Sequence, residues 1–176
     1  MECFDVLNEN GEFTGIVETR EKCHKQGLWH RANYCFVFNE NNDVLLQKRS
    51  ANKKLWPNLW DVTAGGHVLA GEFGTDSLIR EIKEEIGIDV DEKDVKYLVG
   101  STSINIVGDI VNKHFNECYI VTKNVNIKDI ILQKDEVSDI KWFTKHEILN
   151  MIDDNYKGLT EKTGVWNFLR KYYEKQ

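Results

Sequence analysis

Short stretches rich in apolar residues recur along the chain, separated by polar, turn-forming sequences. This is the pattern of β-strands joined by turns. The first two such stretches, residues 4–7 and 13–18, flank the turn-forming sequence Asn-Glu-Asn-Gly. A second pair, residues 32–38 and 44–48, flanks a polar run rich in asparagine. Both arrangements predict β-hairpins.

Further along the chain the pattern predicts strands that are interleaved with helices. Residues 50–58 indicate an exposed loop, and residues 60–64 a short strand ahead of two glycines. Apolar residues with helical spacing predict a helix over residues 75–86, which Gly87 can end. The remaining expected elements are strands at 95–103, 114–122 and 140–143, and helices at 145–152 and 163–173. Interleaved strands and helices favour the α/β class, with a mixed sheet covered by helices.

The composition is that of one folded unit. The chain has 176 residues, of which 41% are hydrophobic and 30% charged, enough apolar surface for a core and too much for a disordered chain. No repeat or linker divides it, so we expect a single domain over residues 1–176. The formal net charge of −6 argues against binding of a nucleic-acid polymer, because an acidic surface repels its backbone. A small phosphorylated substrate remains compatible, since divalent cations bridge carboxylates to a diphosphate.

Neither the spacing of the cysteines nor the length of the apolar segments indicates any further chemistry. No two of the four cysteines form a Cys-x-x-Cys pair, so we expect reduced thiols at Cys3, Cys23, Cys35 and Cys118. The N-terminal residues do not resemble a signal peptide, and no apolar run approaches the roughly 18 residues of a membrane span. A cytoplasmic protein without a membrane partner is therefore expected. Apolar residues at helical spacing within 163–173 predict either a packing face or a homodimer contact.

The most specific pattern lies between residues 66 and 88. It reads Gly66-x5-Glu72-x7-Arg80-Glu81-Ile82-x-Glu84-Glu85-x-Gly87-Ile88. Glu81, Glu84 and Glu85 stand at positions i, i+3 and i+4, so they share one face of the predicted helix. Apolar residues fall on a neighbouring face that can pack on the sheet. Carboxylates so close repel one another unless hard cations such as Mg²⁺ or Mn²⁺ lie between them, so the spacing predicts a metal site.

Residues around this helix extend the predicted site. Several glycines allow the preceding loop to fold back toward the helix, where a backbone carbonyl can supply an oxygen ligand. Arg80 is predicted to pair with Glu72 and to hold the geometry of the site. Arg31, Lys48 and Arg49 are candidates for contact with phosphate, although such side chains are most often simply exposed.

The pattern matches the catalytic box of the Nudix hydrolases without a departure, and the chain resembles that family over most of its length. The resemblance implies an α/β/α sandwich with a mixed sheet and a catalytic loop–helix–loop. It also implies Mg²⁺- or Mn²⁺-dependent cleavage of a nucleoside diphosphate linked to another group. By motif position, Glu81, Glu84 and Glu85 would bind the metal, Gly65 would add a carbonyl ligand, and Glu72 would support the cluster.

The resemblance also points to a carboxylate outside the box. In many family members a glutamate from a later loop completes the site, and Glu136 holds the matching place here. The expected mechanism is substitution by water at phosphorus, with a carboxylate taking the proton. The catalytic base varies within the family, so Glu81 and Glu136 both remain open for that role.

Stretches outside the box resemble the isopentenyl-diphosphate isomerase branch of the same superfamily. That branch binds a metal through three histidines and two glutamates, and the positions that match are His24, His30, His67 and Glu117. However, Gly65 stands where the isomerase needs a cysteine, and Phe115 where the second glutamate is expected. Allylic isomerisation needs both an acid and a base, and these departures leave one of the two without a residue. Hydrolysis is therefore favoured over isomerisation.

A third possibility is a non-catalytic Nudix-like sensor that binds a nucleotide or a sugar nucleotide. Such sensors tend to lose glutamates of the box, and this chain retains all of them. The sequence thus favours an enzyme. It does not distinguish between a nucleoside diphosphate, a dinucleoside polyphosphate, a sugar nucleotide and a prenyl diphosphate as the substrate.

Overall fold

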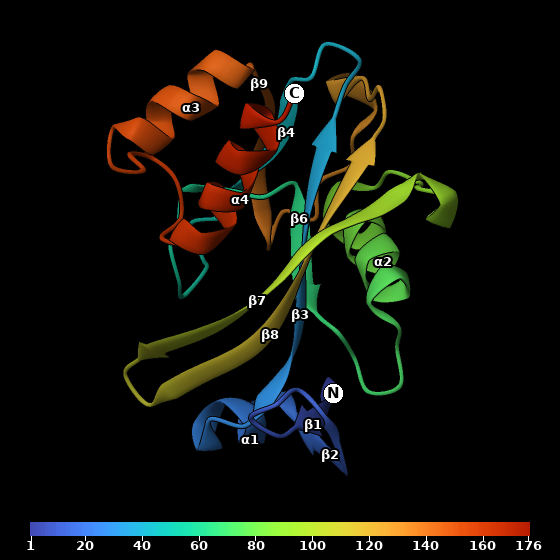
Figure 1. The fold of residues 1–176 in the computed structure, drawn as a ribbon, viewed down its shortest axis with the longest axis vertical. Coiled ribbons are helices and arrows are strands. Elements are labelled where there is room, and N and C mark those ends of the chain that lie inside the picture. The colour runs from blue at the N-terminus through green and yellow to red at the C-terminus, as the bar shows by residue number, and fades with distance from the viewer.

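The computed structural model describes residues 1–176 as a mixed β-sheet with helices on both faces (Figure 1). The strands are β1 (Cys3–Leu7), β2 (Phe13–Thr19), β3 (Trp29–Phe38), β4 (Val44–Arg49), β5 (Trp60–Asp61), β6 (Ala64–His67), β7 (Val95–Val107), β8 (Ile110–Thr122) and β9 (Val137–Phe143). The helices are α1 (Arg20–Gln26), α2 (Gly74–Ile86), α3 (Lys145–Asp153) and α4 (Thr163–Glu174). The α/β class predicted from the sequence is confirmed.

Strand β3 is the centre of the sheet. One edge pairs in parallel with β8, with His30 opposite His114 near the start of β3. The other edge is shared by β1, β6 and β4, all antiparallel to β3. Beyond these neighbours, β9 pairs with β4 and β7 pairs with β8. One parallel pair among antiparallel pairs makes the sheet mixed and brings the far segment β8 beside β3.

Alternation along β3 directs its side chains into two cores. Phe36 and Phe38 belong to the core that α3 and α4 cover, and Cys35 and Val37 to the core that α2 covers. The side chains of α2 in that second core are Leu78, Ile82 and Ile86. Burial of each contributes about 1.5–3 kcal/mol, so α2 is firmly attached and its opposite face has a fixed position.

Helix α1 is an element that the sequence pattern does not predict. It has seven residues and a single buried side chain, Cys23, so almost no apolar periodicity is present to detect. Its ends are nevertheless well defined. The Thr19 hydroxyl accepts a hydrogen bond from the Lys22 N–H, and Gly27 ends the helix in the left-handed region at φ 62°.

The sheet also differs from the prediction at two places. The strand predicted at 60–64 is divided into β5 and β6, because the Thr63 hydroxyl donates to the Leu45 carbonyl and accepts from the Val37 N–H instead of continuing one strand. Strands β7 and β8 run on to Val107 and Ile110, forming a two-stranded ribbon that projects beyond the rest of the sheet (Figure 1). None of the helices combines the length and the apolar composition needed to cross a membrane.

Candidate active site

Helix α2 presents its carboxylates in a gradient from the interior to the surface. Glu85 is 7% exposed, whereas the side chains of Glu81 and Glu84 are 16% and 53% exposed. Glu85 Oε2 accepts two hydrogen bonds of 3.1 Å, from the backbone N–H of Gly65 and from Nε2 of Gln47. The innermost carboxylate is therefore held by the loop on one side and by the sheet on the other.

The surroundings of these carboxylates oppose their negative charge. Burial, with a further contribution from nearby Glu81, raises the pKa of Glu85 to about 8. Burial also raises the pKa of Glu81, although the Arg80 guanidinium acts against it. A nearby cation stabilises the ionised form of a buried carboxyl group whose pKa is raised. The cluster therefore suits a divalent metal ion.

Two glycines let the loop before α2 approach this cluster. A Cβ atom on Gly66 would lie 2.4 Å from the carboxyl carbon of Glu81, and one on Gly65 would lie 2.7 Å from the Asn33 carbonyl oxygen. Any side chain at these positions would displace either the carboxylate or the backbone of β3. Close contacts thus disfavour any side chain at Gly66 of the box and at the adjoining Gly65.

Arg80 connects the carboxylates of the helix to that of the loop. Its Nε and Nη2 donate to the two oxygens of Glu72 at 3.0 and 3.1 Å, which is the pairing predicted from the sequence. Its Nη1 donates to Glu81 at 2.8 Å and to Glu84 at 3.2 Å. Although burial raises the pKa of Glu72, the hydrogen bonds from Arg80 leave it lowered overall. The planar guanidinium therefore fixes the relative positions of three carboxylates.

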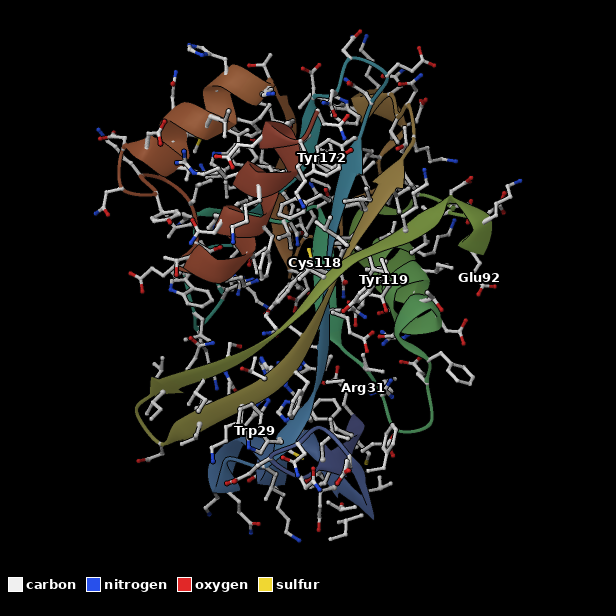
Figure 2. All side chains as sticks on the ribbon, viewed as in Figure 1. Trp29, Arg31, Glu92, Cys118, Tyr119 and Tyr172 are labelled. Carbon is white, nitrogen blue, oxygen red and sulfur yellow. The ribbon has the colours of Figure 1, made fainter.

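The three cations predicted to contact phosphate lie in different settings. The guanidinium of Arg31, labelled in Figure 2, donates to the Glu72 carbonyl at 2.7 Å. That of Arg49 points inward and donates to the buried Asp61 carboxylate at 3.2 Å. Lys48 forms no ion pair, and its ammonium lies over the Trp60 ring, 5.9 Å from the ring centroid.

Glu136 lies in the loop before β9, which packs against the C-terminal end of α2. The Gln133 N–H donates to the Glu85 carbonyl at 3.0 Å. The Glu136 carboxylate forms an ion pair with Lys53 and is close enough to contribute to the raised pKa of Glu85. Glu136 therefore borders the cluster.

Comparison with known proteins places this fold and box in a family. A model of the NUDIX domain matches residues 28–162. The chain belongs to the Nudix family. The uncharacterized Nudix hydrolase lmo0368 of Listeria monocytogenes is 36% identical over 148 residues, which cover 84% of this chain and 83% of that protein. The expected enzyme class, a Nudix hydrolase, is confirmed, and Nudix hydrolases generally use divalent metals.

Solved Nudix structures share the fold. DR0079 from Deinococcus radiodurans has a TM-score of 0.72 at 22% identity, covering 96% of this chain and 98% of that one. The NUDIX domain of Shewanella oneidensis NrtR, complexed with ADP ribose, has a TM-score of 0.58 at 15% identity, covering 81% and 86%. At these identities the likeness establishes the Nudix fold, with its mixed sheet between helices.

Sequence reasoning missed two polar features beside the Nudix box. Gln47 shares with Leu45 the face of β4 that meets α2, which alternation along the strand predicts in retrospect. Lys162, far along the chain, donates to both oxygens of Asp61 at 3.0 and 2.8 Å. Burial raises the pKa of Asp61, but Lys162 and Arg49 lower it overall. No local pattern marks this buried pair.

The histidines of the isomerase-like stretches lie together, but Glu117 is not among them. The cluster consists of His24, His30, His67 and a histidine that was not predicted, His114. Glu117 lies on the opposite face of β8, where its carboxylate accepts from the Tyr119 hydroxyl. There it borders the start of α2, since a Cβ atom on Gly74 would lie 1.9 Å from it. The isomerase-like metal set is therefore not assembled in its predicted form.

The thiols of the chain are also placed for packing. Cys23, Cys35 and Cys118 are buried, and none of the four cysteines forms a disulfide. Burial raises the pKa of Cys118 to about 12. A protonated thiol in the core is a small apolar side chain, so none of these three replaces the cysteine that the isomerase has at Gly65.

Proposed function

We propose that this Nudix hydrolase is a Mg²⁺- or Mn²⁺-dependent enzyme that cleaves the diphosphate bond of a nucleoside diphosphate or a nucleoside diphosphate derivative. The observation that carries the proposal is the cluster of Glu81, Glu84 and Glu85, which Arg80 and the glycine loop hold in one place. The ADP ribose bound to the NrtR NUDIX domain supports a substrate of this class.

The carboxylate cluster fits a hard divalent cation. Carboxylate and carbonyl oxygens are the ligands that Mg²⁺ and Mn²⁺ prefer, so the proposed ligands are Glu81, Glu84, Glu85 and the carbonyl of Gly65. The buried Glu85 has a raised pKa, and its charge is compensated there only by two hydrogen bonds from neutral groups. A bound ion supplies neutralisation of the diphosphate and a lower pKa for coordinated water.

The residues around the cluster position the reacting groups. Arg80 and Glu72 hold the loop against the helix by their bidentate pair. Lys48, which has no acidic partner, is proposed to contact a phosphate of the substrate. Arg31 and Arg49 act indirectly, because their guanidinium groups already bind the loop and a buried aspartate.

Either of two carboxylates is proposed to take the proton from the attacking water. Glu81 lies inside the cluster, and Glu136 lies in the loop that borders it. Glu136 is not a proposed metal ligand, so Glu136→Gln leaves the metal site intact. A large loss of kcat in this variant, with unchanged Mg²⁺ affinity, would assign the base to Glu136, whereas retained kcat would leave the role to Glu81.

Phosphorus NMR tests the proposed activity. The protein is incubated with Mg²⁺ and a panel of nucleoside diphosphates, ADP-ribose and UDP-sugars. New monophosphate resonances are expected with the wild type. They should be absent after chelation and in the Glu84→Gln variant, whose circular dichroism should match the wild type. Glu92→Gln is the matched control, because it removes an exposed charge outside the cluster (Figure 2). Wild-type turnover in Glu84→Gln would refute the proposed site.

A further inference from the structure

A second cluster of metal-ligating side chains lies at the junction of the N-terminal elements and the sheet. Four histidines contribute to it from four elements: His24 from α1, His30 from β3, His67 from β6 and His114 from β8. One ring nitrogen of each lies within 4.8 Å of the corresponding nitrogens of the others. Segments distant in sequence thus bring four imidazoles to one point.

Five buried ring nitrogens in this cluster have no hydrogen-bond partner. This holds for buried Nε2 of His24, His30 and His67, and for both ring nitrogens of His114. Buried polar atoms in proteins are nearly always paired, and each exception calls for an explanation. Orphaned nitrogens that converge on one point are explained if they share a single ligand.

The environment of His30 defines which of its nitrogens faces the cluster. Its Nδ1 lies 2.8 Å from the Leu28 carbonyl oxygen, which can only accept, so Nδ1 carries the proton. Nε2 therefore keeps its lone pair. A hydrogen bond from the other ring nitrogen to a backbone carbonyl is the usual support of a metal-binding histidine. Phe4 stacks on His30 and on His67, with ring centroids 4.9 and 4.8 Å apart, and excludes water from that side.

We propose that these four histidines bind one borderline-soft transition-metal ion, with Zn²⁺ the best fit. Neutral imidazole is a preferred ligand of Zn²⁺, and no carboxylate belongs to the cluster, which disfavours Mg²⁺ and Ca²⁺. Nitrogens around a tetrahedral Zn²⁺ are about 3.3 Å apart, from a bond length of about 2.0–2.1 Å. The present separations need only small ring movements to reach that geometry. This site is chemically distinct from the carboxylate cluster on α2.

The ion would attach the N-terminal elements to the sheet. The core under α1 and β1 is small, with Phe4, Val6 and Cys23 as its only buried members. A metal bound from α1 and three strands compensates for so few apolar contacts. The site also adjoins the catalytic loop, because the His67 carbonyl accepts from Nη2 of Arg80 at 3.4 Å. Its proposed role is structural, and it does not depend on the proposed substrate.

Metal titration of the purified full-length protein tests this site. After removal of metal with a chelator, Zn²⁺ binding is measured by calorimetry, and Co²⁺ is added as a spectroscopic probe. We expect one Zn²⁺ or Co²⁺ per chain at this site, with the intense visible absorption of tetrahedral Co²⁺. Excess Mg²⁺ should not displace it, and Glu85→Gln should retain it.

Histidine variants distinguish this site from surface binding. His67→Gln and His24→Gln should each weaken Zn²⁺ binding at least 100-fold and abolish the rise in Tm that Zn²⁺ produces. His146→Gln is the matched control, because His146 is the remaining histidine and lies exposed on α3. If His67→Gln does not fold, His24→Gln still decides, since that ring is only partly buried. Wild-type binding in His24→Gln, or no tetrahedral Co²⁺ spectrum in the wild type, would overturn the proposal.

Discussion

Glu85→Gln should abolish activity and, at alkaline pH, stabilise the metal-free protein. Glu85 is buried, and burial together with nearby Glu81 raises its pKa from the ordinary 4.5 to about 8. A shift of this size corresponds to about 5 kcal/mol between the protonated and ionised forms in the folded state. Glutamine keeps the oxygen that accepts from Gly65 and Gln47 and carries no charge.

The sign of the pH dependence follows from linkage. Because the pKa of Glu85 is higher in the folded state, the folded protein retains a proton that the unfolded chain has released between about pH 4.5 and 8. The free energy of unfolding of the metal-free wild type should therefore fall as pH rises through this window. The glutamine variant should lack this contribution and should unfold at higher urea concentration than the wild type at pH 9.

Urea unfolding with EDTA, at pH 6 and pH 9, measures this difference. Glu84→Gln is the matched control, since it removes the same charge from a half-exposed side chain on the same helix. Mg²⁺ should stabilise the wild type more than Glu85→Gln, because metal binds the ionised carboxylate. The reasoning is refuted if Glu85→Gln has the same pH dependence as the wild type, or if it is less stable at pH 9.

Three further substitutions test the surroundings of the site. Arg80→Lys should lower kcat about tenfold or more with little change in Tm, because an ammonium group cannot bridge three carboxylates; steady-state kinetics would show this, and unchanged kcat would contradict it. Gly66→Ala should displace the Glu81 carboxylate and lower kcat more than Tm. A Mg²⁺ affinity equal to that of the wild type would contradict this expectation. Asp61→Asn should cost about 3–5 kcal/mol of unfolding free energy by leaving Lys162 buried without its partner, and denaturant titration would test this loss.

Acid should weaken the same buried pair. The pKa of Asp61 is lower in the folded state than its ordinary value of 3.8, because Lys162 and Arg49 outweigh the effect of burial. The contribution of the pair to the free energy of unfolding is thus fully present above about pH 4 and is lost as pH falls through the folded pKa.

No local sequence pattern predicts this buried pair, whereas elements with strong periodicity could be predicted from the sequence.

Helix α2 and strand β3 were predictable because their patterns are local. The helical repeat alone places Glu81, Glu84 and Glu85 on one face, and burial of both faces gives β3 its continuous apolar run. Helix α1 was not predictable, since seven residues with one buried side chain show no repeat. The strands that pair with β3 could not be predicted either, because strand order depends on contacts between segments that are distant in the sequence.

The same distinction applies to the sites. Arg80 and Glu72 are paired within one loop and helix, so motif spacing was sufficient to predict the contact. The presence of His114 in the histidine cluster depends on the parallel register that sets it opposite His30. Alternation alone could have separated Glu117 from His114, because positions an odd number apart on a strand face opposite sides.

The most direct test of the proposed chemistry is phosphorus NMR of ADP-ribose and related nucleoside diphosphate derivatives in ¹⁸O-labelled water. With Mg²⁺, the wild type should cleave at least one of them to two monophosphates, with ¹⁸O in only one product. Glu85→Gln and the chelated wild type should give no products. Cleavage by Glu85→Gln at the wild-type rate, or cleavage that persists in the presence of chelator, would contradict a metal-dependent hydrolysis carried by the glutamates of α2.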